Sequence, residues 1–219
     1  MTHTRRALLA GAAACGVLGA AGCLGGTEGA GGEGAVTEYD CGDTGAPEPD
    51  AEYRPALGAA DADVVVQAFE DFTCPHCATY TTEEFPTVRA EYVDPGTVRY
   101  EHWDFPIPVD ETWAVPVASA ARGVGARQGD EAFFAFTSTV YESIGEYSLD
   151  VVGAAAEAAG ADPCVAIADA RAESYADPVS TDRETGVDRG VQGTPTIYVA
   201  GEAVDASADA IGSAIEDAL

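Results

Sequence analysis

Two cysteines separated by two residues carry the clearest chemical signal in this sequence. They lie in the motif Cys74-Pro75-His76-Cys77, between the β-branched run of residues 64–69, which predicts a buried strand, and residues 78–93, which predict a helix. Cys74 should therefore stand at a helix N-terminus, where unpaired N–H groups and the helix dipole stabilise a thiolate. Cys77 lies one turn further along the helix, close enough to Cys74 to form a disulfide.

The two residues between the cysteines favour an oxidising disulfide. Pro75 fixes the first helical turn at a position where its missing N–H costs no hydrogen bond. His76 can place a positive charge or an N–H donor near the Cys74 sulfur. A stabilised thiolate stabilises the reduced form of the pair, so the disulfide becomes a stronger oxidant. The motif therefore predicts a donor of disulfides more than a reductant.

The elements that must hold this motif alternate between strands and helices. A second strand is expected over residues 97–103, and Pro86 should kink the helix that precedes it. The remaining elements are four helices over residues 112–125, 130–143, 149–159 and 162–174, a strand over 196–199, a turn at Gly201 and a closing helix over 206–218. This order, a β-α-β unit, a helical insertion, then β-turn-β and a last helix, predicts an α/β fold.

A series of motifs resembles the DsbA-like thiol–disulfide oxidoreductases of the thioredoxin superfamily. In order, these motifs are Leu57-Gly58, Phe72-Thr73-Cys74-Pro75-His76-Cys77, Phe105-Pro106, Gln128-Gly129 and Gly193-Thr194-Pro195-Thr196. The resemblance covers residues 55–219 and implies a thioredoxin fold with an inserted helical domain at about residues 110–185. It also implies a quinone-linked membrane partner that reoxidises the cysteines. No bound cofactor is expected, because the two sulfurs hold the electrons themselves.

The resemblance assigns the second half of the site to a proline loop. In this family the proline that matches Pro195 is cis and faces the disulfide, and the residue that matches Thr194 lies beside it. A cis bond exposes backbone N–H and C=O groups that can pair with an extended substrate. We therefore expect Thr194 and Pro195 to bind substrate.

One position departs from the family pattern. Family members commonly carry a buried acid six residues before the first cysteine, which is thought to shuttle a proton to the second, and Ala68 stands there in this chain. Glu70 can take over that role if the strand keeps its alternation without a bulge. The alternative interpretation is that Glu70 is a solvated acid.

The first 22 residues resemble an export signal. The pair Arg5-Arg6 precedes the weakly apolar residues 7–21, as in a twin-arginine signal. The following Cys23 ends a sequence similar to a lipoprotein box, which predicts lipidation at this residue; the alternatives are an uncleaved membrane anchor and simple secretion. Residues 23–54 are expected to form a flexible Gly/Pro-rich tether. These features predict a protein anchored to the outer face of the cell membrane.

The composition excludes binding to nucleic acid through phosphate neutralisation. The chain of 219 residues has 10 basic residues, all of them Arg, against 38 acidic ones, and a formal net charge of −28. Such a chain cannot assemble a basic patch. The acids are dispersed rather than clustered in a tail or a calcium loop, which indicates adaptation to molar salt in an extreme halophile.

The other cysteines and histidines have simpler interpretations. Cys41 and Cys164 can form a structural disulfide, or Cys164 can be a small buried hydrophobic residue and Cys41 a thiol of the tether. No zinc site is expected, because zinc needs four ligands and no second pair of suitable spacing accompanies Cys74 and Cys77. His102 is interpreted as a packed or hydrogen-bonded residue.

Together these features predict an extracytoplasmic thiol–disulfide oxidoreductase that introduces disulfides into reduced exported proteins. A substrate thiolate attacks the Cys74 sulfur of the Cys74–Cys77 disulfide, and a second substrate thiol resolves the mixed disulfide. Two alternatives stay open: the same fold acting as a reductase or isomerase, and a lipoprotein that binds a metal ion, such as copper, through the same cysteines. The presence of a single Met, at position 1, weakens the soft-metal alternative.

Overall fold

The computed structural model describes residues 37–107 and 109–219. The predicted signal peptide and Cys23 lie outside these residues. Within them, no helix is both long enough and apolar enough to cross a membrane.

The strands and helices follow the predicted α/β order. The strands are β1 (Ala56–Gly58), β2 (Val64–Glu70), β3 (Val98–Asp104), β4 (Thr196–Val199) and β5 (Glu202–Val204). The α-helices are α1 (Pro75–Thr79), α2 (Phe85–Val88), α3 (Ala114–Gln128), α4 (Asp130–Tyr141), α5 (Leu149–Ala158), α6 (Pro163–Ala172), α7 (Ala176–Asp188) and α8 (Ala208–Ala218), and the π-helical turns are η1 (Tyr80–Glu84) and η2 (Arg89–Val93).

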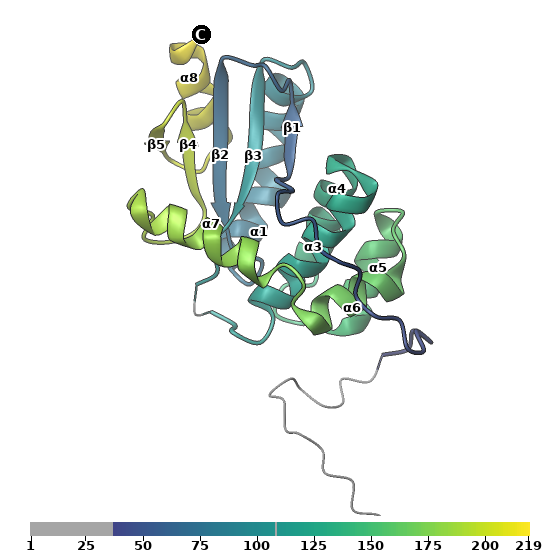
Figure 1. The fold of residues 1–219 in the computed structure, drawn as a ribbon. Helices are drawn as coiled ribbons and strands as arrows, with labels where there is room; N and C mark the ends of the chain where they lie inside the picture. The colour runs from purple at the N-terminus through teal and green to yellow at the C-terminus, as the bar shows by residue number, and fades with distance from the viewer. Residues whose placement is uncertain (1–36, 108) are drawn as a thin grey trace, which may run out of the picture. The chain divides into compact units, whose positions relative to one another are not determined.

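The strands form one mixed sheet in the order β1-β3-β2-β4-β5 (Figure 1). β2 and β3 run parallel, and the other neighbouring pairs run antiparallel. The pairing of β2 with β3 continues without a bulge from Val64 opposite Val98 to Glu70 opposite Asp104. Because side chains alternate along a strand, Ala68 and Glu70 point to the same face, which is the condition under which Glu70 can replace the missing acid.

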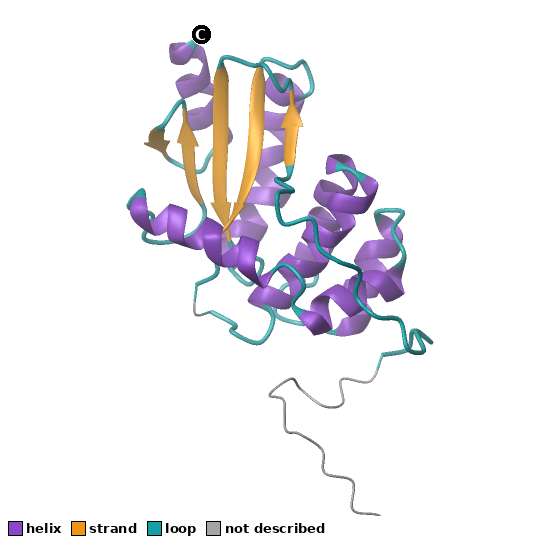
Figure 2. Ribbon diagram, in the orientation of Figure 1, coloured by secondary structure: helices purple, strands orange, loops and turns teal. Residues whose placement is uncertain are grey.

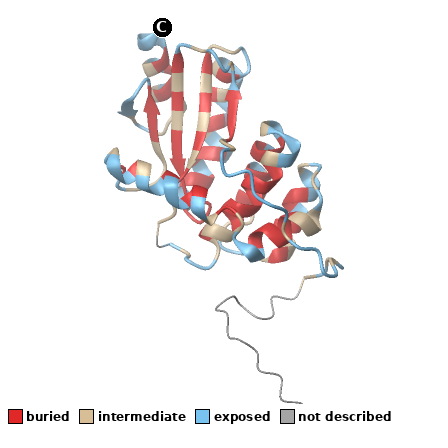
Figure 3. Ribbon diagram, in the orientation of Figure 1, coloured by how far each residue is buried: buried red, intermediate tan, exposed pale blue. Residues whose placement is uncertain are grey.

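Helices cover both faces of this sheet (Figure 2). On one face, α7 packs on β3 over a cluster that includes Phe69 and Phe105. Gly186 of α7 comes so close that an added Cβ would lie 2.6 Å from Phe105. The opposite face is covered by the helical segment that begins at Pro75 and by α8, which contacts β4. Figure 3 shows buried residues both in the central strands and along the inner sides of the helices that follow β3.

The predicted helical insertion is confirmed between β3 and β4. Its four predicted helices correspond to α3–α6, and Phe133 and Phe136 of α4 are fully buried in its core. α7 was not among the predicted helices, because its sequence is mostly polar. It forms because Pro178 is tolerated in a first turn and because Val179 and Gly186 are buried by packing.

The helix that follows the cysteine motif is continuous from residue 75 to residue 93, with two π-helical turns. One of them, η1, directly precedes α2, where Pro86 occupies the first turn. Pro86 has no N–H to donate to the preceding turn, so the departure from α-helical geometry falls where the sequence predicts an irregularity.

Residues 37–54 lie against the helical insertion. Cys41 forms a disulfide with Cys164 of α6, which agrees with the first of the two interpretations that the sequence left open for these cysteines. Tyr39 packs so closely on Gly153 of α5 that an added Cβ there would lie 2.4 Å from the ring. The described part of the segment predicted as a tether is therefore attached to the insertion by a covalent bond and by packing.

Candidate active site

Cys74 and Cys77 lie at the start of α1, as the sequence predicts. Cys74 is the N-cap residue, with extended backbone dihedrals, and Pro75 occupies the first helical position. The Cys74 carbonyl accepts a hydrogen bond from the Cys77 N–H at 3.0 Å, which places both cysteines on one turn. Both residues are unbonded thiols and are buried, Cys77 completely.

The environment of Cys74 stabilises its thiolate. The hydrogen bond from the Cys77 thiol is the main cause that lowers the pKa of Cys74 to about 5, against the opposing effect of burial. Thr194 and the backbone N–H groups of Cys77 and His76 add to this stabilisation. The His76 side chain is exposed. Among the described residues, no hydrogen bond joins its ring to the Cys74 sulfur, so His76 contributes through its backbone.

Cys77 is held in the opposite protonation state. Burial is the main cause that raises the pKa of Cys77 well above its usual range, followed by the hydrogen bond with Cys74 and the charge of Glu70. The Asp71 N–H points at the Cys77 sulfur from 3.5 Å. The pair therefore combines one anionic sulfur with one protonated sulfur.

The proline loop reaches the cysteines from the other end of the chain. The Thr194–Pro195 peptide bond is cis, and the Thr194 carbonyl lies 3.3 Å from the Cys74 sulfur. Thr194 and Pro195 also line a cavity of about 330 Å³ together with His76 and Glu84. The predicted juxtaposition of Cys74 with this loop is confirmed.

The loop between β2 and Cys74 is fixed by contacts that sequence reasoning missed. The Asp71 carboxylate accepts hydrogen bonds from the Thr73 N–H at 2.7 Å and the Ile107 N–H at 2.7 Å. Tyr141 and Tyr147 donate their hydroxyls to the carbonyls of Asp71 and Phe72. The spacing of Asp71 and Thr73 is typical of a turn in which an aspartate caps the backbone, and this was the available signal.

Glu70 is buried, and its carboxylate has a hydrogen-bond donor on one side and an ion-pair partner on the other. It is 3 % exposed, so the interpretation of Glu70 as a solvated acid is wrong. Thr81 donates its hydroxyl to Glu70 at 2.9 Å, and the Nδ1 atom of His102 lies 3.5 Å from the other carboxylate oxygen. Tertiary packing encloses Glu70 because it points to the sheet face covered by the active-site helix.

A row of buried charges continues from Glu70 into the insertion. The His102 ring also meets Asp104, at 3.2 Å, and Arg122 of α3 bonds both Asp104 and Asp182 of α7. Burial raises the pKa of Asp104, but Arg122 and His102 outweigh it and hold that pKa well below its usual range. The signal for Arg122 was an arginine between Ala121 and Gly123 in the middle of an Ala-rich helix, because a buried charge needs a partner.

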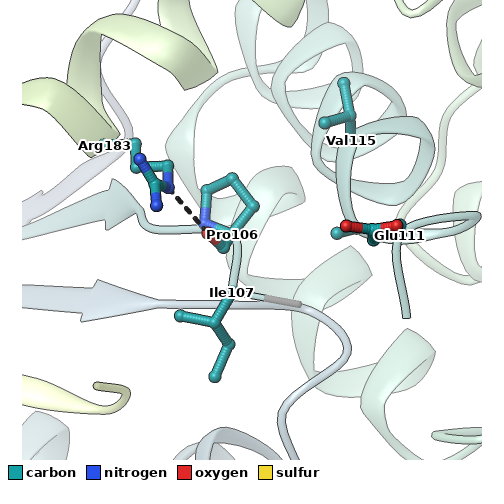
Figure 4. A pocket seen from close by; sticks show the side chains of 6 residues that line it. Pro106, Ile107, Glu111, Val115 and Arg183 are labelled. Atoms are coloured by element: carbon teal, nitrogen blue, oxygen red, sulfur yellow. Dashed lines mark hydrogen bonds between the residues drawn. The ribbon is translucent and has the colours of Figure 1, made fainter. Parts of the chain in front are cut away.

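A second cavity, of about 370 Å³, lies beside the loop that follows β3 (Figure 4). Arg183 of α7 points at the Pro106 carbonyl there and donates a hydrogen bond at 3.1 Å, and Glu111 lies across the cavity. No cysteine lines it. Within the described residues, no group of three or more His, Cys, Asp or Glu side chains is placed to hold a metal ion.

The site has the form of a thiol redox centre: a cysteine pair at a helix N-terminus, opposite a cis-proline loop, on a mixed sheet. The sequence comparisons agree, since residues 50–217 match the family model described as thioredoxin. The probable disulfide bond formation protein D of Bacillus anthracis is 26% identical over 173 residues, which cover 75% of this chain and 77% of that protein. Disulfide bond formation protein D of Bacillus subtilis is 24% identical over 168 residues, 74% of each chain.

Solved structures show the same fold. The structure of oxidised BdbD from Bacillus subtilis superposes with a TM-score of 0.69 at 24% identity, covering 81% of this chain and 98% of that one. The structure of Chlamydia trachomatis DsbA gives a TM-score of 0.66 at 20% identity, covering 80% and 95%. The chain therefore belongs to the thioredoxin family, and its paired cysteines make it a thiol–disulfide oxidoreductase with a helical insertion.

Proposed function

We propose that the protein donates disulfides to reduced exported proteins through Cys74 and Cys77. A substrate thiolate attacks the Cys74 sulfur of the disulfide, the Cys74–Cys77 bond breaks, and the Cys77 sulfur leaves with the electron pair and takes up a proton. A second substrate thiolate then attacks the substrate sulfur of the mixed disulfide and releases the Cys74 thiolate. The substrate has lost two electrons, which the cysteine pair now holds.

The difference between the two sulfurs is the observation that carries this proposal. A Cys74 thiol with a pKa of about 5 is almost fully ionised at neutral pH, which stabilises the reduced pair and makes Cys74 a good leaving group. Both properties favour transfer of the disulfide to a substrate. A stabilised reduced pair and a good leaving group favour a reductase or an isomerase less than a disulfide donor. Reduction or isomerisation of substrate disulfides is kept as the alternative function. The metal-binding alternative has no support from the described contacts of the pair.

The thiolate titration and the reduction potential test the direction. We expect the ultraviolet absorbance of the Cys74 thiolate to titrate with a midpoint near pH 5, and reactivity toward an alkylating agent to fall as the pH drops below it. We expect a potential well above the value of about −270 mV of thioredoxin, toward the value of about −120 mV of DsbA. The measurement is equilibration with glutathione at high salt. A potential near that of thioredoxin would assign the protein to the reductases.

The remaining site residues have roles that follow from their positions. We propose that the Thr194–Pro195 loop binds the substrate backbone next to the reacting sulfur, because the Thr194 carbonyl is 3.3 Å from Cys74 and both loop residues line the adjacent cavity. Pro75 fixes the first turn. Glu70 exchanges the proton of Cys77, because it is buried at this site and its charge acts on Cys77.

We propose that the protein is exported and held at the outer face of the membrane by a lipid on Cys23, where a quinone-linked membrane partner reoxidises the cysteine pair. The Cys41–Cys164 disulfide supports an oxidising compartment. In this proposal residues 1–22 are the export signal, and the residues between Cys23 and the segment that packs on the insertion are a linker.

The variant Cys23→Ala tests this anchor. A single lipid-modified residue carries all of the proposed attachment, so the variant should move from the membrane fraction to the medium. The measurement is fractionation of cells that express either form, with mass spectrometry of the mature N-terminus as a second readout. A variant that stays in the membrane fraction, or an unmodified N-terminus, would contradict lipidation.

We also propose that the acidic surface adapts the protein to molar salt. The formal net charge of −28 leaves many carboxylates without cationic partners, and dilute buffer screens their repulsion over a Debye length of about 30 Å instead of about 3 Å. The protein should therefore unfold on dialysis into dilute buffer and refold when salt is restored. Circular dichroism at both salt concentrations measures this, and an unchanged melting curve contradicts the adaptation.

A further inference from the structure

The imidazole of His102 lies between two carboxylates inside the protein. Its side chain is 1% exposed, with Nε2 3.2 Å from an Asp104 oxygen and Nδ1 3.5 Å from a Glu70 oxygen. Within the described residues Nδ1 makes no hydrogen bond, so its contact with Glu70 is an ion pair. A neutral imidazole carries one N–H and one lone pair, so it would turn the lone pair toward one of the two carboxylates. Only the imidazolium ion offers a proton to both.

The two carboxylates do not depend equally on His102. Asp104 is also bound by Arg122, at 2.5 Å. Glu70 receives a hydrogen bond from the neutral Thr81, and among the described residues its only ion-pair partner is His102. Burial disfavours the charged imidazole, but the interactions with Asp104 and Glu70 prevail and raise the pKa of His102 to about 9. His102 therefore supplies the positive charge that compensates Glu70 at neutral pH.

The charge of Glu70 in turn acts on the buried sulfur of Cys77. Thr81, which donates to Glu70, follows Cys77 by four residues and so lies on the same face of the active-site helix. The charge of Glu70 contributes to the raised pKa of Cys77. The other titratable groups that this charge reaches are the hydroxyls of Tyr80, Tyr100 and Tyr141, whose pKa values burial raises, so they stay neutral.

We propose that His102 is a positioning residue that keeps Glu70 ionised, so that Glu70 can take the proton of Cys77 when this sulfur attacks a mixed disulfide at Cys74. This inference rests on the proposed function. In the step, the proton of the Cys77 thiol passes to a Glu70 oxygen and the Cys74–Cys77 bond forms. The bond between Cys74 and the partner sulfur breaks, and the partner leaves as a thiolate with the electron pair.

The reaction of the reduced protein with oxidised glutathione separates the attack of Cys77 on the mixed disulfide from the earlier formation of that mixed disulfide at Cys74. Cys74 first attacks glutathione disulfide and becomes glutathionylated, and Cys77 then expels the second glutathione. Acid quenching and mass spectrometry give both rates from about pH 5 to about pH 9. In His102→Gln, which keeps an N–H donor without the charge, the first rate should stay within about twofold, because Cys74 is activated by other groups.

The second rate should change in His102→Gln. Without the imidazolium, the charged form of Glu70 is less favourable, so we expect the pH profile of the second step to move up by about one to three units. At neutral pH the step should slow by about tenfold or more. Glu70→Gln should slow the same step by about 100-fold, and adding His102→Gln to it should have no further effect, because His102 acts through Glu70.

Arg127→Gln is the matched control. It removes the cation of the Arg127–Asp169 pair, which joins α3 to α6 and touches neither cysteine, so both steps should be unchanged. Proton NMR of His102 in the unmodified protein adds a measurement that needs no substitution at this position. Its resonance should titrate near pH 9 and at a lower pH in Glu70→Gln.

Several results would overturn the proposal: equal slowing of both steps in His102→Gln, an unmoved pH profile of the second step, an additional loss in the Glu70→Gln background, or a His102 titration that ignores Glu70. Failure of the proposed function looks different, because the unmodified protein would then fail to react at Cys74 or show a reducing potential.

Discussion

Replacing Cys74 by serine is expected to abolish disulfide transfer to a reduced model protein. Cys74 is the sulfur with the low pKa and the one that lies against the Thr194 carbonyl of the proposed substrate loop, so it is the atom at which we expect the substrate to attack. A serine hydroxyl forms no disulfide, and Cys77 is completely buried and held as a thiol. The measurement is the appearance of the model protein's disulfides, and the rate should fall to that of the uncatalysed reaction.

Replacing Cys77 by serine should cause covalent complexes with the partner to accumulate, whereas Cys74→Ser should form none. Cys74 keeps its position at the helix N-terminus, and the serine hydroxyl can still donate a hydrogen bond to its thiolate. The Cys74 thiolate of the variant therefore attacks the disulfide of an oxidised partner and releases one of its sulfurs as a thiolate, but no internal sulfur can then expel the partner from the mixed disulfide. Covalent complexes that disappear on reduction should accumulate on non-reducing gels. Disulfide transfer by this variant at the rate of the unmodified protein would mean that the Cys74–Cys77 disulfide is not the donor.

The double variant Cys41→Ser, Cys164→Ser is the control for both experiments. It removes the other disulfide, which links the N-terminal segment to α6 and is not part of the site. It should be less stable, by about 2–4 kcal/mol in the usual range for a disulfide, and still transfer disulfides when folded. Loss of transfer in a folded double variant would show that the cysteine effects are not confined to the site.

The largest effect on stability is expected from Arg122→Met. Arg122 is 1 % exposed and bonds both Asp104 and Asp182, so the substitution removes the cation that the two buried carboxylates share. Among the described residues, Asp104 then keeps only His102 as a cationic partner, and Asp182 keeps only the partly exposed Arg54. Removing one partner of a buried charge cluster costs about 3–5 kcal/mol. Urea unfolding at high salt measures the difference in free energy of unfolding. Arg99→Met is the control, because its pair with Glu101 is partly exposed and should contribute about 0–1 kcal/mol.

The same cluster predicts how stability depends on acid. The folded protein lowers the pKa of Asp104, so its ionised form contributes stability at pH values above the ordinary carboxyl pKa of about 4 and loses it as the pH falls further. In Arg122→Met the carboxylate is destabilised and protonates more readily. The difference between the two proteins should therefore shrink below about pH 4. A constant difference across this range would mean that Arg122 acts through packing alone.

The chemistry of this protein could be predicted from short segments of its sequence. The spacing of Cys74 and Cys77 between a β-branched run and an amphipathic helix sets the position of both sulfurs within one turn, which is a local property of the chain. The helices α3–α6 and the strands β2, β3 and β4 were likewise visible as periodic apolar patterns. The cysteine spacing and these helices and strands depend on residues that are close together in the sequence, so the sequence alone is enough to predict them.

The electrostatics of the site were decided by contacts between distant segments. Thr194 meets Cys74 across 120 positions, and Asp182 meets Arg54 across 128. The sequence could not decide whether Glu70 is a buried base or a solvated acid. Its burial depends on the uninterrupted register of β2 with β3 and on the active-site helix that covers this face of the sheet.

His102 was interpreted as a packed or hydrogen-bonded residue, which it is. The sequence alone determined which sulfurs react and that Cys74 is the one stabilised as a thiolate. Only the tertiary structure decided that the charges of Glu70 and His102 lie buried behind Cys77. The reason is that burial and ion pairing, which set the protonation state of a buried side chain, depend on contacts between segments that are far apart in the sequence.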